Sequence, residues 1–177
     1  MGTWMNSDGL YVKYGTSEGV STFKAGEYED TIAGMTILEI TVPLTSLTET
    51  ETILSDAVFI PANAFINWVE TVAIVGAATG VAIDVGLIAR DRSTAIDYDG
   101  LLAAAPTSNM NTAGETSRYQ VAVTIPTGLT GTGALVGTEV TTAGGGYVSA
   151  SRTTATAFTA GTIKIRIAYT QKGYDNP

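Results

Sequence analysis

The most constraining feature of the sequence is an alternation of apolar and other residues with a period of two, which recurs in short segments. The clearest case is 162–170, where Ile163, Ile165, Ile167 and Tyr169 alternate with Thr, Lys, Arg and Ala. Successive side chains of an extended strand point to opposite faces of a sheet. The alternation therefore places one side of each segment in a core.

The same pattern predicts strands along the chain from residue 35 onward, separated by Gly, Pro, Asn and Thr. These strands are expected at 35–44, 58–61, 65–75, 81–88, 95–98, 119–125, 135–141, 147–150, 153–158 and 162–170. Residues 100–105 are read as either one helical turn or an irregular apolar stretch. Eight to ten short strands without a long amphipathic helix predict an all-β domain over residues 35–177, a single β-sandwich of the jelly-roll type.

Two of these strands carry specific expectations. Segment 65–75 is expected to present one apolar face to the core, interrupted only by Glu70 and formed by Ile66, Trp68, Val72 and Ile74. The glycine-bounded turn at 76–80 predicts that this strand and 81–88 are antiparallel neighbours. Asp84 and Arg90 then lie on the face opposite the core.

Residues 1–34 lack sustained periodicity and are predicted to form an extended N-terminal arm with one short strand near 10–14. The arm is rich in aromatic residues among Gly, Ser and acids. A terminus that frays is one interpretation. Docking of these side chains on a partner subunit is the other, and it is favoured by their density. The candidate interface residues are Trp4, Leu10, Tyr11, Val12, Tyr14, Phe23 and Tyr28.

Composition excludes several classes of function. The chain has no Cys and no His, which removes disulfides, thiolate nucleophiles, Ser-His-Asp triads and His-ligated zinc sites. With a net charge of -8 and no run of Lys or Arg, nucleic acid and anionic membrane surfaces are not expected partners. The longest nearly apolar run, 72–83, is shorter than the ~20 residues of a spanning helix. The N-terminus lacks the features of a secretory signal, so we expect localisation through assembly or a removed leader.

Carboxylates supply the candidate chemistry. Asp97 and Asp99, followed by Gly100, could begin a calcium loop, but the other ligands at EF-hand spacing are missing, so a solvated acidic turn is favoured. A glycoside hydrolase would need two acids about 5–9 Å apart in one cleft, and Glu70, Asp84 and Asp97 are the conceivable members. For Glu70, an inward charge that pairs with an arginine or acts against edge aggregation is the favoured alternative. We expect no catalytic residue, cofactor or metal.

Aromatic residues leave a second class of function open. Rings of Trp and Tyr stack on the apolar faces of sugars, and Trp4, Trp68 and the tyrosines could form such a platform, although burial of Trp68 in the core is favoured. A carbohydrate- or receptor-binding β-sandwich of a tail or cell-surface apparatus is therefore the alternative function.

Several stretches of the sequence are distinctive: WMNSDGLYVKYGT at 4–16, IPANAFI at 60–66 leading into 68–85, DVGL at 84–87 and TAFTAGTIKIRIAY at 156–169. Together these stretches resemble small structural proteins of tailed phages, which are often encoded beside the major capsid protein. The resemblance implies a jelly-roll-like decoration (cement) protein on the outer capsid surface of the virion. It further implies the major capsid protein as partner, a homo-oligomeric state (trimer or dimer) and no catalytic residues.

Overall fold

The computed structural model describes residues 35–120, 129–142 and 144–171, together with the backbone of three short segments nearer the N-terminus. The strands are β1 (Thr3–Met5), β2 (Tyr11–Lys13), β3 (Lys24–Asp30), β4 (Met35–Pro43), β5 (Thr52–Ile53), β6 (Phe59–Ile60), β7 (Ala64–Thr79), β8 (Ala82–Ala89), β9 (Ala95–Pro106), β10 (Thr116–Tyr119), β11 (Gly146–Arg152) and β12 (Phe158–Gln171). Two short 3-10 helices, η1 (Leu44–Ser46) and η2 (Thr107–Asn109), follow β4 and β9.

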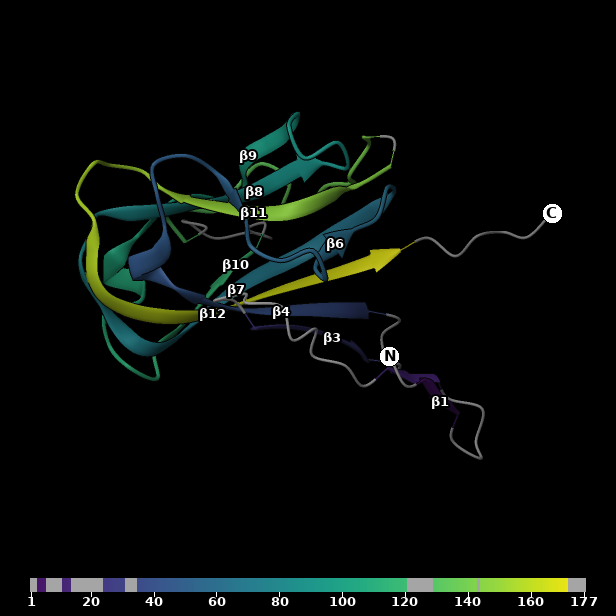
Figure 1. The fold of residues 1–177 in the computed structure, drawn as a ribbon, viewed down its shortest axis with the longest axis horizontal. Coiled ribbons are helices and arrows are strands. Elements are labelled where there is room, and N and C mark those ends of the chain that lie inside the picture. The colour runs from purple at the N-terminus through teal and green to yellow at the C-terminus, as the bar shows by residue number, and fades with distance from the viewer. Residues whose placement is uncertain are drawn as a thin grey trace.

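The strands form two main sheets that face each other (Figure 1). The first sheet has the order β10-β7-β12-β4-β3. The second has the order β5-β11-β8-β9, with β6 also paired to β11. Within the described part of the chain every strand pair is antiparallel, and β1 and β2 pair only with each other. The prediction of a single all-β sandwich is confirmed.

The connections identify the sandwich as a jelly roll. From β4 onward the chain changes sheet at each connection except β5 to β6 and β8 to β9. The result is two facing rows of four, β10-β7-β12-β4 and β9-β8-β11-β5, with β3 added beside β4. Two antiparallel sheets filled alternately by one chain are the jelly-roll arrangement.

The prediction that the segments now seen as β7 and β8 are neighbours is wrong. They lie in different sheets, because β10 and β12 occupy both edges of β7 while β11 and β9 occupy both edges of β8. Only residues 80–81 separate the two strands, and they carry the chain from one sheet to the other. Thr79 there has a φ of 59°, and the Phe158 ring packs against Gly80.

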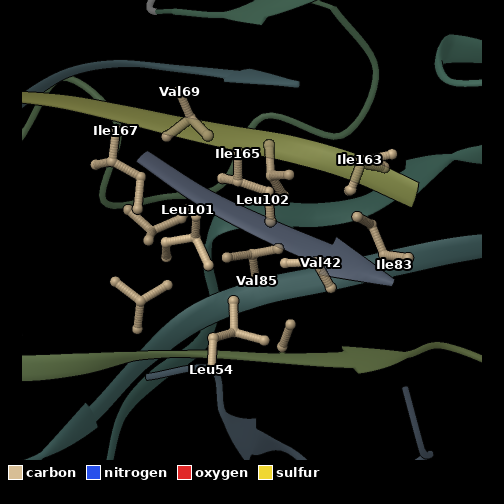
Figure 2. Close-up of a cluster of buried hydrophobic side chains, with 14 of the residues drawn as sticks. Val42, Leu54, Val69, Ile83, Val85, Leu101, Leu102, Ile163, Ile165 and Ile167 are labelled. Atoms are coloured by element: carbon tan, nitrogen blue, oxygen red, sulfur yellow. The ribbon is translucent and has the colours of Figure 1, made fainter. Parts of the chain in front are cut away.

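Apolar side chains from the two sheets meet between the layers, as Figure 2 shows. The first sheet supplies Val42, Val69, Ile163, Ile165 and Ile167, and the second supplies Ile83, Val85, Leu101 and Leu102, all fully buried. Leu54, which follows β5, completes the labelled cluster. Burying one such side chain stabilises the fold by roughly 1.5–3 kcal/mol relative to leaving it exposed.

A bulge in β7 reverses the face predicted for that strand. Trp68 lies opposite Ala168 but Ile66 lies opposite Tyr169, so β7 advances two residues where β12 advances one. Ile66 is buried before the bulge, whereas Val69 and Ala73 are buried after it. One extra residue exchanges the two faces of a strand. The predicted common face of Ile66 with Trp68, Val72 and Ile74 is therefore wrong.

Other boundaries also differ. Strand β9 runs unbroken through the residues read as a helical turn, because β8 supplies backbone partners as far as Pro106. Residues 135–141 form turns whose backbone groups bond to 63–66 instead of a regular strand. Residues 153–156 are bends that precede β12. Of the strand predicted at 119–125, β10 holds residue 119, and 121–125 lie outside the described residues.

Candidate interaction surface

The structure places four of the seven candidate interface residues of the N-terminal arm by their backbone. Trp4 in β1 lies opposite Val12 in β2, and Tyr11 is also in β2. Tyr28 in β3 lies opposite Ile37 of β4, so that part of the arm extends the first sheet. Leu10, Tyr14 and Phe23 lie outside the described residues.

On the outer face of the first sheet, opposite charges lie side by side across four strands. Arg118 of β10 lies opposite Glu70 of β7, Glu70 opposite Arg166 of β12, and Arg166 opposite Glu39 of β4. Lys164 also pairs with Glu39, and its Nζ lies 2.7 Å from Glu39 Oε1. Directly opposed charges of opposite sign stabilise neighbouring strands. We call these five residues the charged row.

Glu70 is the buried member of the charged row, with only 5 % of its surface exposed. Its Oε2 accepts hydrogen bonds from Arg118 Nε at 3.1 Å and Nη2 at 2.8 Å, while its Oε1 accepts one from Arg166 Nη1 at 3.1 Å. A carboxylate taken out of water is stable when both oxygens are satisfied in this way. The expectation that Glu70 pairs with an arginine is confirmed.

Trp68 lies on the same outer face and is half-buried, so its predicted place in the core is wrong. The bulge in β7 is the cause, since it exchanges the two faces of the strand after Ile66. The guanidinium of Arg118 stacks on the Trp68 ring, with Cζ 4.4 Å from the ring centroid. One face of this ring is therefore already covered within the molecule.

A second group of side chains lies at one end of the other sheet, and we call it the arginine–aromatic cluster: Phe59, Tyr147, Arg90 and Arg92. Phe59 and Tyr147 are register partners on β6 and β11, and their rings meet edge to face with centroids 5.2 Å apart. Arg90 Cζ lies 5.5 Å from the centroid of Phe59, and Arg92 Cζ lies 5.0 Å from that of Tyr147. Arginine and aromatic side chains are the types enriched where proteins bind proteins.

The turn between β8 and β9 positions both arginines. Asp91 Oδ1 accepts hydrogen bonds from the backbone N–H groups of Ser93 at 3.0 Å and Thr94 at 2.9 Å. The Thr94 hydroxyl donates to Asp91 Oδ2 at 2.5 Å, and these three bonds lower the pKa of Asp91 to about 2. Arg92 has a φ of 63° and pairs with Asp56, with Nη2 2.9 Å from Oδ1. A short Asx turn therefore holds the two guanidinium groups over the two rings.

Four carboxylates gather around β8 and β9, and we call them the acidic group: Glu51, Asp84, Asp97 and Asp99. Burial raises the pKa of Asp84, and the charges of Asp99 and Glu51 add to the effect. Burial also raises the pKa of Asp97, together with hydrogen bonding and repulsion from Asp99. Asp84 Oδ1 accepts a hydrogen bond from the Ala104 N–H at 2.7 Å.

The acids proposed for hydrolysis are not all brought together. Asp84 and Asp97 both interact with Asp99 on the second sheet, whereas Glu70 lies on the outer face of the first. Among the described residues, no group of three or more Asp or Glu side chains is placed to hold a metal ion. No helix in the described part of the chain is long and apolar enough to cross a membrane.

Sequence reasoning missed the arginine–aromatic cluster because its members come from three separate segments, β6, the turn between β8 and β9, and β11. Phe59 and Tyr147 are 88 positions apart and meet only because β6 and β11 pair. The one local signal is the sequence Arg90-Asp-Arg92, a turn that presents two cations.

Comparisons with known proteins add little to this geometry. No protein-family model matches the sequence, and no curated protein matches it. Among solved structures, the chain is similar to one from the X-ray crystal structure of tomato aspermy virus. The match covers 92% of this chain and 91% of that one, at 16% identity and a TM-score of 0.31. A superposition of that quality supports no argument about function. Any functional argument must therefore rest on the fold and surface of the chain itself.

Proposed function

We propose that the chain is a non-enzymatic structural protein of a virus particle. In the finer form of this proposal, it decorates the outer surface of a tailed-phage head as a homo-oligomer, binding the major capsid protein between capsomers. The observation that carries the proposal is the jelly-roll strand order, an architecture used in viral capsids. Lectin domains share that architecture, so the strand order alone does not separate a capsid role from carbohydrate binding. The surface residues have to decide between the two functions.

The surface supports protein binding. The arginine–aromatic cluster presents two cations and two rings from a rigid sheet end, which is the composition of protein-binding hot spots. Sugar stacking by Trp68 is disfavoured because Arg118 covers one face of its ring. Hydrolysis by Glu70 is disfavoured because arginines occupy both of its oxygens.

The test is binding of the purified chain to heads of the phage that produces it, after those heads have been stripped of minor outer proteins. We expect saturable binding in a fixed ratio to the major capsid protein, and a higher melting temperature of the head. Heads that keep their outer proteins are the control and should bind little. A chain indifferent to stripped heads that binds on a glycan array would overturn the proposal in favour of the carbohydrate-binding alternative.

A truncation tests the N-terminal interface. Deleting residues 1–23 removes Trp4, Leu10, Tyr11, Val12, Tyr14 and Phe23 but keeps β3 in its sheet. We expect the truncated chain to fold, as checked by circular dichroism, and to occupy fewer sites on stripped heads. Unchanged occupancy would show that these residues are not the interface, while leaving the virion role intact.

A further inference from the structure

The outer face of the second sheet has two chemically different ends. At one end Phe59, Tyr147 and Ile88 lie in one row across β6, β11 and β8. At the other, Ser151 lies opposite Asp84. The two rows are four residues apart on both β11 and β8, which corresponds to about 13 Å along the strands. The arginine–aromatic cluster therefore marks one end of this face and Asp84 the other, while Asp97, opposite Leu87, lies between them.

The end that holds the arginine–aromatic cluster has a guanidinium without a carboxylate partner. Arg90 is exposed and stacks on Phe59, and among the described residues it forms no ion pair. Every other Lys or Arg whose side chain the structure describes has a carboxylate partner; these are Arg92, Arg118, Arg152, Lys164 and Arg166. Stacking on the ring fixes one face of the Arg90 guanidinium while its N–H groups remain able to donate.

The carboxylates of the acidic group, in turn, lack cationic partners. None of the described cations pairs with Glu51, Asp84, Asp97 or Asp99. Asp97 and Asp99 flank Tyr98, whose surface is 39% exposed. A Cβ added to Gly86 would lie 2.0 Å from the Asp97 carbonyl oxygen, so the backbone that carries these acids packs directly on β8. Unpaired carboxylates are thus held on a fixed support beside an exposed aromatic ring.

We propose that this face binds a second copy of the same chain across a two-fold axis. A two-fold axis that lies in the contact plane and is perpendicular to the strands reverses the strand direction, so the arginine–aromatic cluster of each copy meets the acidic group of the other. An isologous contact of this kind requires a self-complementary patch, and a face that presents a guanidinium without an ion pair at one end and carboxylates without an ion pair beyond it meets that requirement. The two contacts pair Arg90 with the carboxylates around Asp99, and both Tyr98 side chains are covered. The inference does not depend on a virion role.

Charge reversal tests the contact on the full chain. Sedimentation equilibrium should give a dimer for the native sequence, and Arg90→Glu and Asp99→Arg should each raise the dimer Kd at least roughly tenfold. The double variant Arg90→Glu/Asp99→Arg should return the Kd to within roughly threefold of the native value, because the opposed charges are exchanged. Misfolding cannot produce such a rescue. Glu115→Arg, ahead of β10 on the first sheet, is the matched control and should leave the Kd unchanged.

A monomeric native chain would overturn the inference, as would an oligomer whose Kd ignores both reversals. The inference would also be overturned if both single reversals raise the dimer Kd and the double variant does not restore it. Binding of stripped heads by a native monomer would reject the two-fold contact and the homo-oligomeric part of the proposed function, and keep the virion role. If the double variant rescues the dimer but the native chain does not bind heads, the two-fold contact is supported and the proposed virion role is rejected.

Discussion

At the scale of single residues, Glu70 shows how one carboxylate can hold three strands together. It is nearly buried, and guanidinium groups from β10 and β12 converge on it. Replacing it leaves Arg118 and Arg166 without their shared acceptor on a sheet face. The cost is therefore larger than that of an exposed ion pair.

Glu70→Ala should lower the free energy of unfolding by about 2 kcal/mol, below the full cost of a buried pair because both arginines remain partly exposed. Urea denaturation measures the change. The control is Asp56→Ala, which breaks a pair whose side chains are 51% and 70% exposed and should cost less than about 1 kcal/mol. Equal losses in the two variants would show that the charged row is no more stabilising than a surface pair.

Asp97 and Asp91 make opposite predictions about pH. Burial and the neighbouring Asp99 raise the pKa of Asp97, so its ionised form destabilises the fold above the folded-state pKa, and the penalty disappears as pH falls below the unfolded value. Asp97→Asn should therefore raise the Tm at pH 7, with the gain shrinking toward pH 4.

The pKa of Asp91 is lowered to about 2, so its ionised form stabilises the fold above the unfolded value, and this stabilisation is lost as pH falls through 2. Asp91→Asn should lower the Tm at pH 7, with the loss shrinking below pH 4. Thermal unfolding of both variants across a pH series measures the changes. Tm changes of the same sign in the two variants at pH 7 would contradict the opposite pKa directions assigned to Asp97 and Asp91.

At the scale of elements, the contact of β8 with β9 depends on a residue without a side chain. A Cβ at Gly86 would lie 2.0 Å from the Asp97 carbonyl oxygen and 2.3 Å from the Tyr98 carbonyl carbon. Backbone atoms cannot yield as a flexible side chain can. The two strands would have to separate to admit even a methyl group.

Gly86→Ala should therefore destabilise the chain by about 3 kcal/mol, in the upper range of overpacking costs. Gly114→Ala is the comparison, because Gly114 has a φ of 87° and nothing within 4 Å of an added Cβ. It isolates the cost of a left-handed backbone, about 1 kcal/mol. Chemical denaturation of both variants gives the difference, and a Gly86→Ala chain as stable as Gly114→Ala would mean that the strands part easily.

At the scale of the whole molecule, β3 links the N-terminal arm to the sandwich. All seven of its residues have register partners on β4, whereas β1 and β2 pair only with each other. Deleting residues 1–23 should leave the Tm within about 2 °C of the native value. Deleting residues 1–34 should lower it by roughly 5 °C, because β4 loses its outer partner at a cost of about 2 kcal/mol. Differential scanning calorimetry distinguishes the two, and equal Tm values would show that β3 adds nothing to the sandwich.

Much of this architecture could be predicted from local pattern. The alternation of Ile163, Ile165 and Ile167 marks a strand with one buried face, and those side chains are fully buried in the structure. Alternation predicts burial because a strand repeats every two residues regardless of its partners. The strand 35–43 follows the same rule. Composition alone excludes whole classes of chemistry, since a chain without His and Cys lacks the side chains that they require.

The sequence by itself therefore determined most of the strands, the sandwich class and the chemistry that the chain lacks, because these depend on residue type and on a period of two. Tertiary structure alone decided which strands are neighbours, which way Trp68 faces and where Arg90 meets Phe59. A bulge of one residue in β7 exchanges the two faces of that strand. Strand β8 joins the other sheet because β10 and β12 already occupy both edges of β7. These choices depend on backbone partners far away in sequence, because each strand must satisfy its hydrogen bonds with whichever edge the rest of the fold leaves open.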